Sequence, residues 1–261
     1  MTIGELLRDW RHHQRMSQLE LALAADISAR HVSLVETGKS RPSADMVLRL
    51  AAQLDVPLRD RNRLLLAAGY APRYRERPLD GRDLEVAHEA VITVLRAHEP
   101  YPAVVIDRRW NIVLTNRAVE PFLTGVDPEL LRPPINMVRL GLHPGGLAPR
   151  IVNLAQVRAV FRARLSRQLA QTRDPEIAAL YDEFLASDAV DDGTTVSIES
   201  EIAIPMIIRH RGQVLRLFST ITTFGTPQDV TLEEIAIESY YPADAQTAEL
   251  LRHPDLDAAA S

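Results

Sequence analysis

The residues best suited to chemistry lie in the stretch SARHVSLVETGKSR, residues 28–41. In this short helix-compatible run, Arg30 can form two hydrogen bonds with a guanine edge, and Ser33 can bond to any base. A single helix would carry five residues on its outward side: Ser28, Ala29, Arg30, His31 and Ser33. A helix of this size fits the major groove of B-DNA. The pattern therefore predicts a surface that reads DNA.

Neighbouring polar residues are placed to contact phosphate. Gln18 and Ser28 begin two consecutive helices, where side chains and free backbone N–H groups can bind phosphate. Lys39 and Arg41 flank the reading helix and would release counterions on binding. Taken singly, each feature is more often an ordinary solvated helix face. Their order and spacing together favour DNA binding.

A catalytic alternative rests on His143, which precedes Gly145-Gly146. A histidine near an asparagine could orient a nucleophile, and a Gly-Gly turn could offer an oxyanion site. The chain has no cysteine, no serine in a nucleophile-elbow setting, and no histidine spacing typical of zinc. GLHPGG also lacks the Lys-Ser/Thr of a phosphate-binding loop. The sequence therefore argues against an enzyme and predicts neither a metal nor a cofactor.

The first 69 residues supply the helices that must position the DNA-reading residues. Apolar residues at helical spacing open the chain: Ile3, Leu6, Leu7 and Trp10. SQLE at residues 17–20 is a capping box that begins a second helix, and Ser28 caps a third. Asp26 can adopt the left-handed conformation that a tight turn between them needs. With two more helices after Pro42 and Pro57, residues 1–69 predict an all-α five-helix bundle that contains a helix-turn-helix.

The remainder mixes helices and strands. Residues 70–82 form an Arg- and Pro-containing linker. Helices are expected over residues 83–98, 116–123, 129–142, 151–170 and 175–187, and after Pro242. Strands are expected over Ala103–Ile106, Trp110–Leu114, Thr195–Ile204, Gln213–Phe224 and Val230–Tyr240. This order predicts an α+β domain, an antiparallel sheet with helices over one face, in which a PAS-like sensor could enclose an apolar cavity.

Charge separates the two parts. Residues 1–80 hold 13 Lys and Arg against 10 Asp and Glu, which leaves 17 and 25 of the totals of 30 and 35 for the remainder. A mildly basic N-terminal part joined to an acidic one is expected when only one domain meets phosphate. No apolar run is long enough to span a bilayer, and the N-terminus lacks the pattern of a signal peptide. The expected location is the cytoplasm.

Two resemblances extend this interpretation. The string SQLELALAADISARHVSLVETGKSRPS resembles the XRE/Cro-type helix-turn-helix family, although that family usually has Gly where this chain has Asp26. From about Leu64 onward, three strings closely resemble the ligand-binding domain of MmyB-like transcription regulators: EPYPAVVIDRRWNIVLTNRA, NMVRLGLHPGGLAPRIVN and RLFSTITTFGTPQDVTLEEIAIESYYPAD. This resemblance implies a PAS-like fold, fatty-acyl or other apolar ligands, and pairing through the C-terminal domain.

A ligand site is expected where the predicted cavity meets polar residues. Arg139 could hold a carboxylate by a bidentate pair at the mouth of the cavity. The expected ligand-binding residues are Tyr101, Trp110, Asn136, Arg139, His143, Asn153 and Phe218. Alternatively, the two asparagines only cap helices and His143 only bonds to a backbone carbonyl.

The resulting prediction is a homodimeric, DNA-binding transcription regulator with three parts. Residues 1–69 would bind a double-stranded operator, residues 70–82 would link, and residues 83–261 would bind an apolar, fatty-acid-like effector and dimerise. No membrane association is expected. One alternative is a C-terminal domain that only dimerises and has no effector. Another is an enzyme with a DNA-binding appendage.

Overall fold

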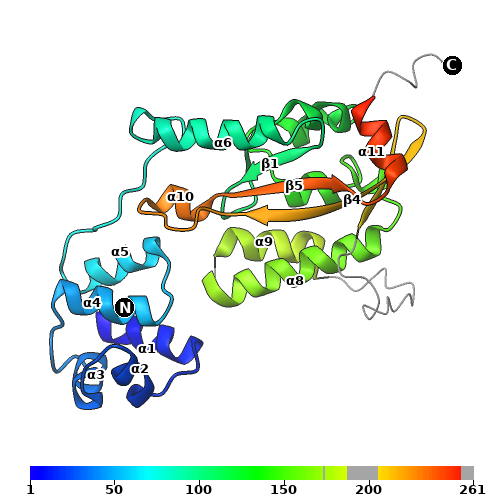
Figure 1. Cartoon of the computed structure of the whole chain (residues 1–261). Helices are drawn as coiled ribbons and strands as arrows, with labels where there is room; N and C mark the ends of the chain where they lie inside the picture. The colour runs from blue at the N-terminus through cyan, green and yellow to red at the C-terminus, as the bar shows by residue number, and fades with distance from the viewer. Residues whose placement is uncertain (173, 187–204, 254–261) are drawn as a thin grey trace. The chain divides into compact units, whose positions relative to one another are not determined.

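A computed structural model describes residues 1–172, 174–186 and 205–253 of the chain (Figure 1). The chain divides into two compact units. The first unit consists of Met1–Glu85 together with Phe224–Glu233, and the second of Val86–Thr223 and Glu234–Ser261. A short segment from late in the sequence therefore packs with the N-terminal residues.

The first unit contains the five expected N-terminal helices. They are α1 (Ile3–His13), α2 (Gln18–Ala24), α3 (Ala29–Glu36), α4 (Ala44–Gln53) and α5 (Leu58–Ala67). Side-chain oxygens of Thr2, Ser17, Ser28 and Ser43 cap the first four helices, each accepting a hydrogen bond from a backbone N–H two or three residues into its helix. Helix α5 has Pro57 at this position and no such cap from its own end. Leucine, valine and alanine side chains from all five helices form one core.

The second unit is built on a five-stranded antiparallel sheet. Its strands are β1 (Ala103–Ile106), β2 (Ile112–Thr115), β3 (Met206–His210), β4 (Gln213–Thr222) and β5 (Ala236–Pro242). The order across the sheet is β2-β1-β5-β4-β3. The two N-terminal strands therefore join the C-terminal hairpin through the β1–β5 ladder.

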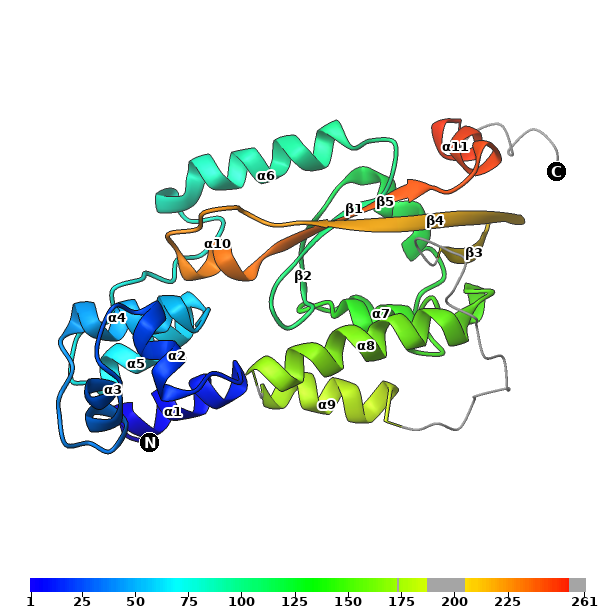
Figure 2. The same cartoon turned by 60° about the horizontal axis from the view of Figure 1, so that its bottom comes forward.

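Helices cover both faces of this sheet, whereas the sequence predicted helices over one face. Helix α6 (Glu85–Ala97) lies on one face, and α7 (Met137–Leu142), α8 (Leu154–Thr172) and α9 (Pro175–Phe184) lie on the other (Figures 1 and 2). Because β1 is covered from both sides, all four of its residues are buried. Helix α11 (Ala245–Arg252) follows β5. Short 3₁₀ segments connect these elements: η1 (Arg82–Leu84), η2 (Arg117–Leu123), η3 (Pro128–Leu131) and η4 (Ala148–Arg150).

Two expected elements have a different structure. The predicted strand Val230–Tyr240 begins as helix α10 (Val230–Glu234), because Asp229 accepts a hydrogen bond from the Thr231 N–H and starts a helical turn. The predicted helix over residues 129–142 is split by Pro133-Pro134 into η3 and α7. The predicted strand Thr195–Ile204 lies wholly outside the described residues, and β3 was not predicted.

The turn between β1 and β2 is longer than expected. The strand predicted over Trp110–Leu114 begins only at Ile112. One carboxylate oxygen of Asp107 accepts hydrogen bonds from the backbone N–H groups of Arg109 and Asn111, at 2.8 and 2.9 Å. These bonds hold Trp110 in a left-handed conformation, with φ of 67°. The indole therefore leaves the strand ladder and packs in the core.

Candidate functional site

Helices α2 and α3 lie side by side and are joined by a tight turn (Figure 1). Asp26 adopts the left-handed conformation in this turn, with φ of 53°. The N–H of Ile27 then donates to the Ala22 carbonyl at 2.9 Å, which closes the end of α2. The hydroxyl of Ser28 accepts from the His31 N–H at 3.1 Å and begins α3. These contacts produce helix-turn-helix geometry.

A buried ion pair holds the first three helices together. Arg11 on α1 contacts both carboxylate oxygens of Glu36 on α3, at 2.7 and 2.9 Å, and both side chains are almost inaccessible to solvent. Gln18 on α2 donates to the same carboxylate at 2.8 Å. Burial opposes ionisation of Glu36, but the hydrogen bonds from Arg11 and Gln18 and the charge of Arg11 lower its pKa below the ordinary value. The carboxylate therefore stays charged and fixes the angle at which α3 leaves the bundle.

Sequence reasoning did not find this network. The available signal was a charged residue at a core position, since Glu36 follows the buried Val35 and is the last residue of α3. Gly4 gives a second sign of close packing between α1 and α3. A Cβ atom there would lie 2.6 Å from the carbonyl oxygens of Val35 and Glu36.

The residues predicted to read DNA lie along one short helix. Arg30 is exposed, and Ala29, His31 and Ser33 are partly exposed. Lys39 is exposed just beyond the end of α3. The structure therefore keeps one arginine of α3 and one nearby lysine accessible, as contact with a groove and its phosphates requires.

Three other predicted DNA contacts already have bonds within the bundle. Gln18 donates to Glu36, and the hydroxyl of Ser28 caps α3, so Ser28 would offer phosphate mainly the N-terminal end of its helix. Arg41 donates from Nε to the Ala68 carbonyl at 3.0 Å, and its guanidinium lies 5.3 Å from the centre of the Tyr70 ring. Contact of Arg41 with phosphate would have to compete with these interactions.

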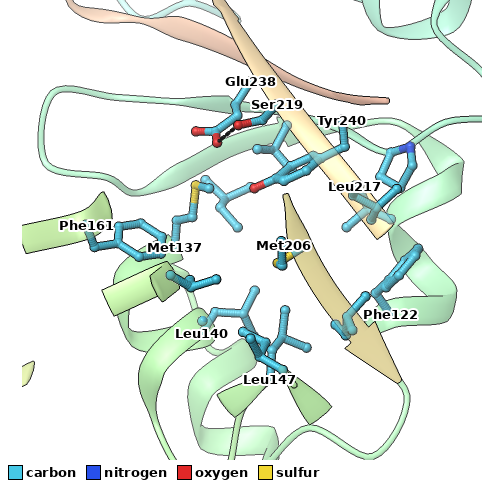
Figure 3. Close-up of a pocket in the computed structure, with 18 of the residues that line it drawn as sticks. Phe122, Met137, Leu140, Leu147, Phe161, Met206, Leu217, Ser219, Glu238 and Tyr240 are labelled. Atoms are coloured by element: carbon cyan, nitrogen blue, oxygen red, sulfur yellow. Dashed lines mark hydrogen bonds between the residues drawn. The ribbon is translucent and has the colours of Figure 1, made fainter. Parts of the chain in front are cut away.

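An apolar cavity of about 140 Å³ lies in the second unit, between the sheet and helices α7 and α8 (Figure 3). Its walls come from the strands, from η2 and from both helices. The labelled apolar side chains include Phe122, Met137, Leu140, Leu147, Phe161, Met206 and Leu217. Such a pocket, mostly apolar with a few polar groups, is typical of small-molecule sites.

None of the seven predicted ligand-binding residues lines this cavity. Phe218 follows the lining residue Leu217 on β4 and therefore points to the opposite face, where its ring stacks on Tyr241. The Tyr101 ring packs edge-on against His98, the residue that follows α6. Trp110 lies behind the wall, 5.6 Å from the Phe161 ring between centroids.

The polar members of the predicted site mostly have structural bonds. The Asn136 side chain caps α7 and donates to the Arg109 carbonyl at 2.9 Å. Arg139 is exposed and forms an ion pair with Glu183 at 2.7 Å. His143 accepts from the Gly145 N–H at 3.0 Å, and Asn153 holds β3 through Pro205 and Ile207. Asn136 and Arg139 meet in a separate, polar surface hollow.

Four polar side chains in the cavity wall were missed. They are Arg164 of α8, Ser219 of β4, and Glu238 and Tyr240 of β5. Arg164 holds Glu238 through both nitrogens of its fork, at 3.1 and 3.3 Å, and the Ser219 hydroxyl donates to Glu238 at 2.8 Å. The sequence signal was an acidic residue, Glu238, two positions before Tyr240 and therefore on the same side of a strand.

The structure shows the surroundings of the residues named for the catalytic alternative. Among the described residues, no group of three or more His, Asp or Glu side chains is arranged to hold a metal ion. His143 bonds to the backbone of its own turn, and its ring lies near Phe184.

No helix in the described part of the chain combines the length and apolar character that crossing a membrane requires.

Comparison with known families agrees with this arrangement. Residues 7–60 match the helix-turn-helix family model, and residues 87–253 match the model described as the MmyB-like transcription regulator ligand binding domain. A helix-turn-helix joined to such a domain defines the class of DNA-binding transcription regulators. Because the second match covers more than half of the sequence, the chain belongs to the family of MmyB-like transcription regulators.

Other comparisons add little. No curated protein matches the chain significantly. One similar solved structure is that of an RNA-binding light-oxygen-voltage receptor, with 13% identity and a TM-score of 0.28. The match covers 98% of this chain and 62% of that receptor chain, so this chain spans less than two thirds of the receptor's length. A TM-score this low does not establish a shared fold, so the PAS-like fold stays a prediction.

Proposed function

We propose that the protein binds a DNA operator through the outward side of α3 and that an apolar effector in the cavity regulates this binding. The observation that carries the proposal is the cavity itself, enclosed by apolar residues in the same chain as a helix-turn-helix. A domain that only dimerises would not require a cavity lined by apolar side chains. The protein would act as a regulator and not as an enzyme.

The effector would be a molecule with an apolar chain of modest length. A cavity of about 150 Å³ holds a molecule the size of benzene, so the space of about 140 Å³ suits a short chain of about five carbons. A short acyl chain would belong to the fatty-acyl class that the family resemblance implies. The aliphatic and aromatic wall would bind the chain by removing it from water.

Operator recognition would require two copies of the chain. In helix-turn-helix dimers, two reading helices contact half-sites one turn of DNA apart, about 34 Å. We propose that this protein is a homodimer that pairs through its C-terminal domain and acts in the cytoplasm, where its operator would be accessible. The family resemblance and the short α3 support this proposal.

The chain also offers a connection between effector and operator. Strands β4 and β5 carry the cavity residues Leu217, Ser219, Glu238 and Tyr240, and the segment Phe224–Glu233 connects these strands. That segment packs in one unit with residues 1–85. We name it the β4–β5 strap. A ligand that prefers one position of the two strands would thereby favour one state of the DNA-binding unit.

Native mass spectrometry and DNA binding of the full-length protein test this function together. We expect protein as purified to retain a small apolar molecule, and its removal to change affinity for an operator selected from random DNA. The measurement is fluorescence anisotropy with the delipidated protein, before and after lipid extract is added. If no molecule is retained and no extract changes the affinity, the C-terminal domain is only a dimerisation module.

A further inference from the structure

The polar side chains of the cavity gather on neighbouring strands and one helix. Ser219 lies directly opposite Tyr240 in the β4–β5 ladder, and Glu238 lies opposite Val104 in the β1–β5 ladder. Figure 3 shows the Ser219–Glu238 hydrogen bond, with the Tyr240 hydroxyl pointing toward the interior of the pocket. A ligand whose chain fills the apolar part would place its polar end here.

The two charged groups of the wall neutralise each other. Glu238 is buried, with only 3% of its surface exposed, and both its oxygens are held by Arg164. The Arg164 guanidinium also lies 4.4 Å from the centre of the Trp110 ring, which covers one of its faces. Arg164 is therefore engaged by a carboxylate and an aromatic ring before any ligand arrives.

A negatively charged ligand would meet an unfavourable site. Its carboxylate would lie near the buried Glu238 and would have to compete with it for Arg164. An uncharged O–H or N–H group avoids this repulsion and can donate to a Glu238 oxygen. Burial, and then the charge of Glu238, raise the pKa of Tyr240 well above its ordinary value, so its hydroxyl stays protonated and can donate or accept.

We infer that the cavity selects an uncharged amphiphile whose polar end donates a hydrogen bond, such as an alcohol or a primary amide, over the corresponding carboxylate. This inference rests on the proposed function of the cavity as an effector site. Glu238 is the residue that sets the specificity, because its charge both neutralises Arg164 and repels an anion.

The test compares three probes of equal chain length, about five carbons to suit the cavity volume. Pentanol, pentanamide and pentanoate are titrated into delipidated full-length protein at neutral pH, and binding is measured by calorimetry. We expect pentanol and pentanamide to bind at least about tenfold more tightly than pentanoate. In Glu238→Gln, Arg164 loses its counter-charge, and pentanoate should become the tightest of the three.

Two further variants control for structural effects. Tyr240→Phe keeps the charges and removes one hydroxyl, so it should weaken binding several-fold but preserve the order of the three probes. Glu183→Gln removes the partner of the exposed Arg139 and should leave the order of the three probes as in the wild type. Tighter binding of pentanoate than of the two uncharged probes by the wild-type protein would overturn the inference and leave the effector site standing. Failure of all three probes to bind would contradict the effector site as well.

Discussion

At the scale of single residues, Arg30 carries the prediction of sequence-specific binding. It is exposed on α3, and no hydrogen bond or ion pair within the described residues fixes its guanidinium. We expect Arg30→Ala to weaken operator binding by about 1–3 kcal/mol and to leave binding to unrelated DNA nearly unchanged, because a bidentate base contact is lost. Anisotropy titrations with both DNAs at several salt concentrations measure this.

Lys39→Ala is the matched control for Arg30. If Lys39 contacts only phosphate, its removal should lower the affinity for all DNA sequences alike and reduce the slope of the salt dependence by about one. If Arg30→Ala behaves in the same way, Arg30 contacts the backbone and another residue reads the bases.

Glu36 makes the stability of the DNA-binding unit depend on pH. Its pKa is lowered in the folded protein, so its contribution is fully present above the unfolded value of about 4.5 and is lost as pH falls through the folded value. Glu36→Gln leaves Arg11 buried without a counter-charge, and we expect it to cost roughly 3–5 kcal/mol at neutral pH. Urea unfolding followed by Trp10 fluorescence, in a Trp110→Phe background, measures this free energy.

The comparison across pH distinguishes the ion pair from simple packing. The difference in unfolding free energy between wild type and Glu36→Gln should shrink below about pH 4.5, because protonation removes the charge from the wild type as well. A difference that stays constant from pH 7 to pH 3 would show that the substitution acts through shape alone.

At the scale of elements, local signals determined what the sequence could predict. Helices α1 to α4 each begin with a capping residue, and the turn at Asp26 needed only a residue that tolerates a positive φ. The alternation over residues 230–240 fitted a strand, but the cap at Asp229 starts a helix there. A pattern of a few residues cannot distinguish the two when a cap competes.

The cavity was harder to predict because it is assembled from distant residues. Phe218 was predicted to bind the ligand, but its neighbour Leu217 lines the cavity. Neighbouring residues of a strand face opposite sides, so an error of one position selects the wrong face. Arg139 was predicted to hold a carboxylate at the mouth of the cavity, yet the arginine in the cavity wall is Arg164, in the middle of the long helix α8. Only the packing of α8 against the sheet brings Arg164 and Glu238 together, 74 residues apart in sequence.

Helix α5 shows the same dependence on distant residues. It lacks a side-chain cap at its own N-terminus, and the Leu58 N–H donates instead to the Glu233 carboxylate at 2.7 Å. Nothing near Leu58 in the sequence could reveal this cap. A carboxylate at this position also interacts favourably with the helix dipole. The β4–β5 strap thereby completes a helix of the DNA-binding unit.

At the scale of the whole molecule, the strap has several anchors in the first unit. Arg77 donates to Asp229 at 2.8 Å, and the Thr231 hydroxyl donates to the Arg77 carbonyl at 2.6 Å. The Val230 N–H donates to the Arg75 carbonyl at 2.9 Å. Asp229 is buried, so these bonds are shielded from water. Five residues after Glu233, the same chain reaches Glu238 in the cavity wall.

Glu233→Ala should therefore weaken the communication between effector and operator. Loss of the α5 cap should lower the stability of the DNA-binding unit by about 1 kcal/mol, and the factor by which effector changes operator affinity should move toward one. Gln228→Ala, an exposed change in the same strap, is the matched control. Coupling is reciprocal, so the factor by which operator changes effector affinity must move toward one by the same amount. If both factors in Glu233→Ala equal those of the wild type, the strap does not transmit the effector signal.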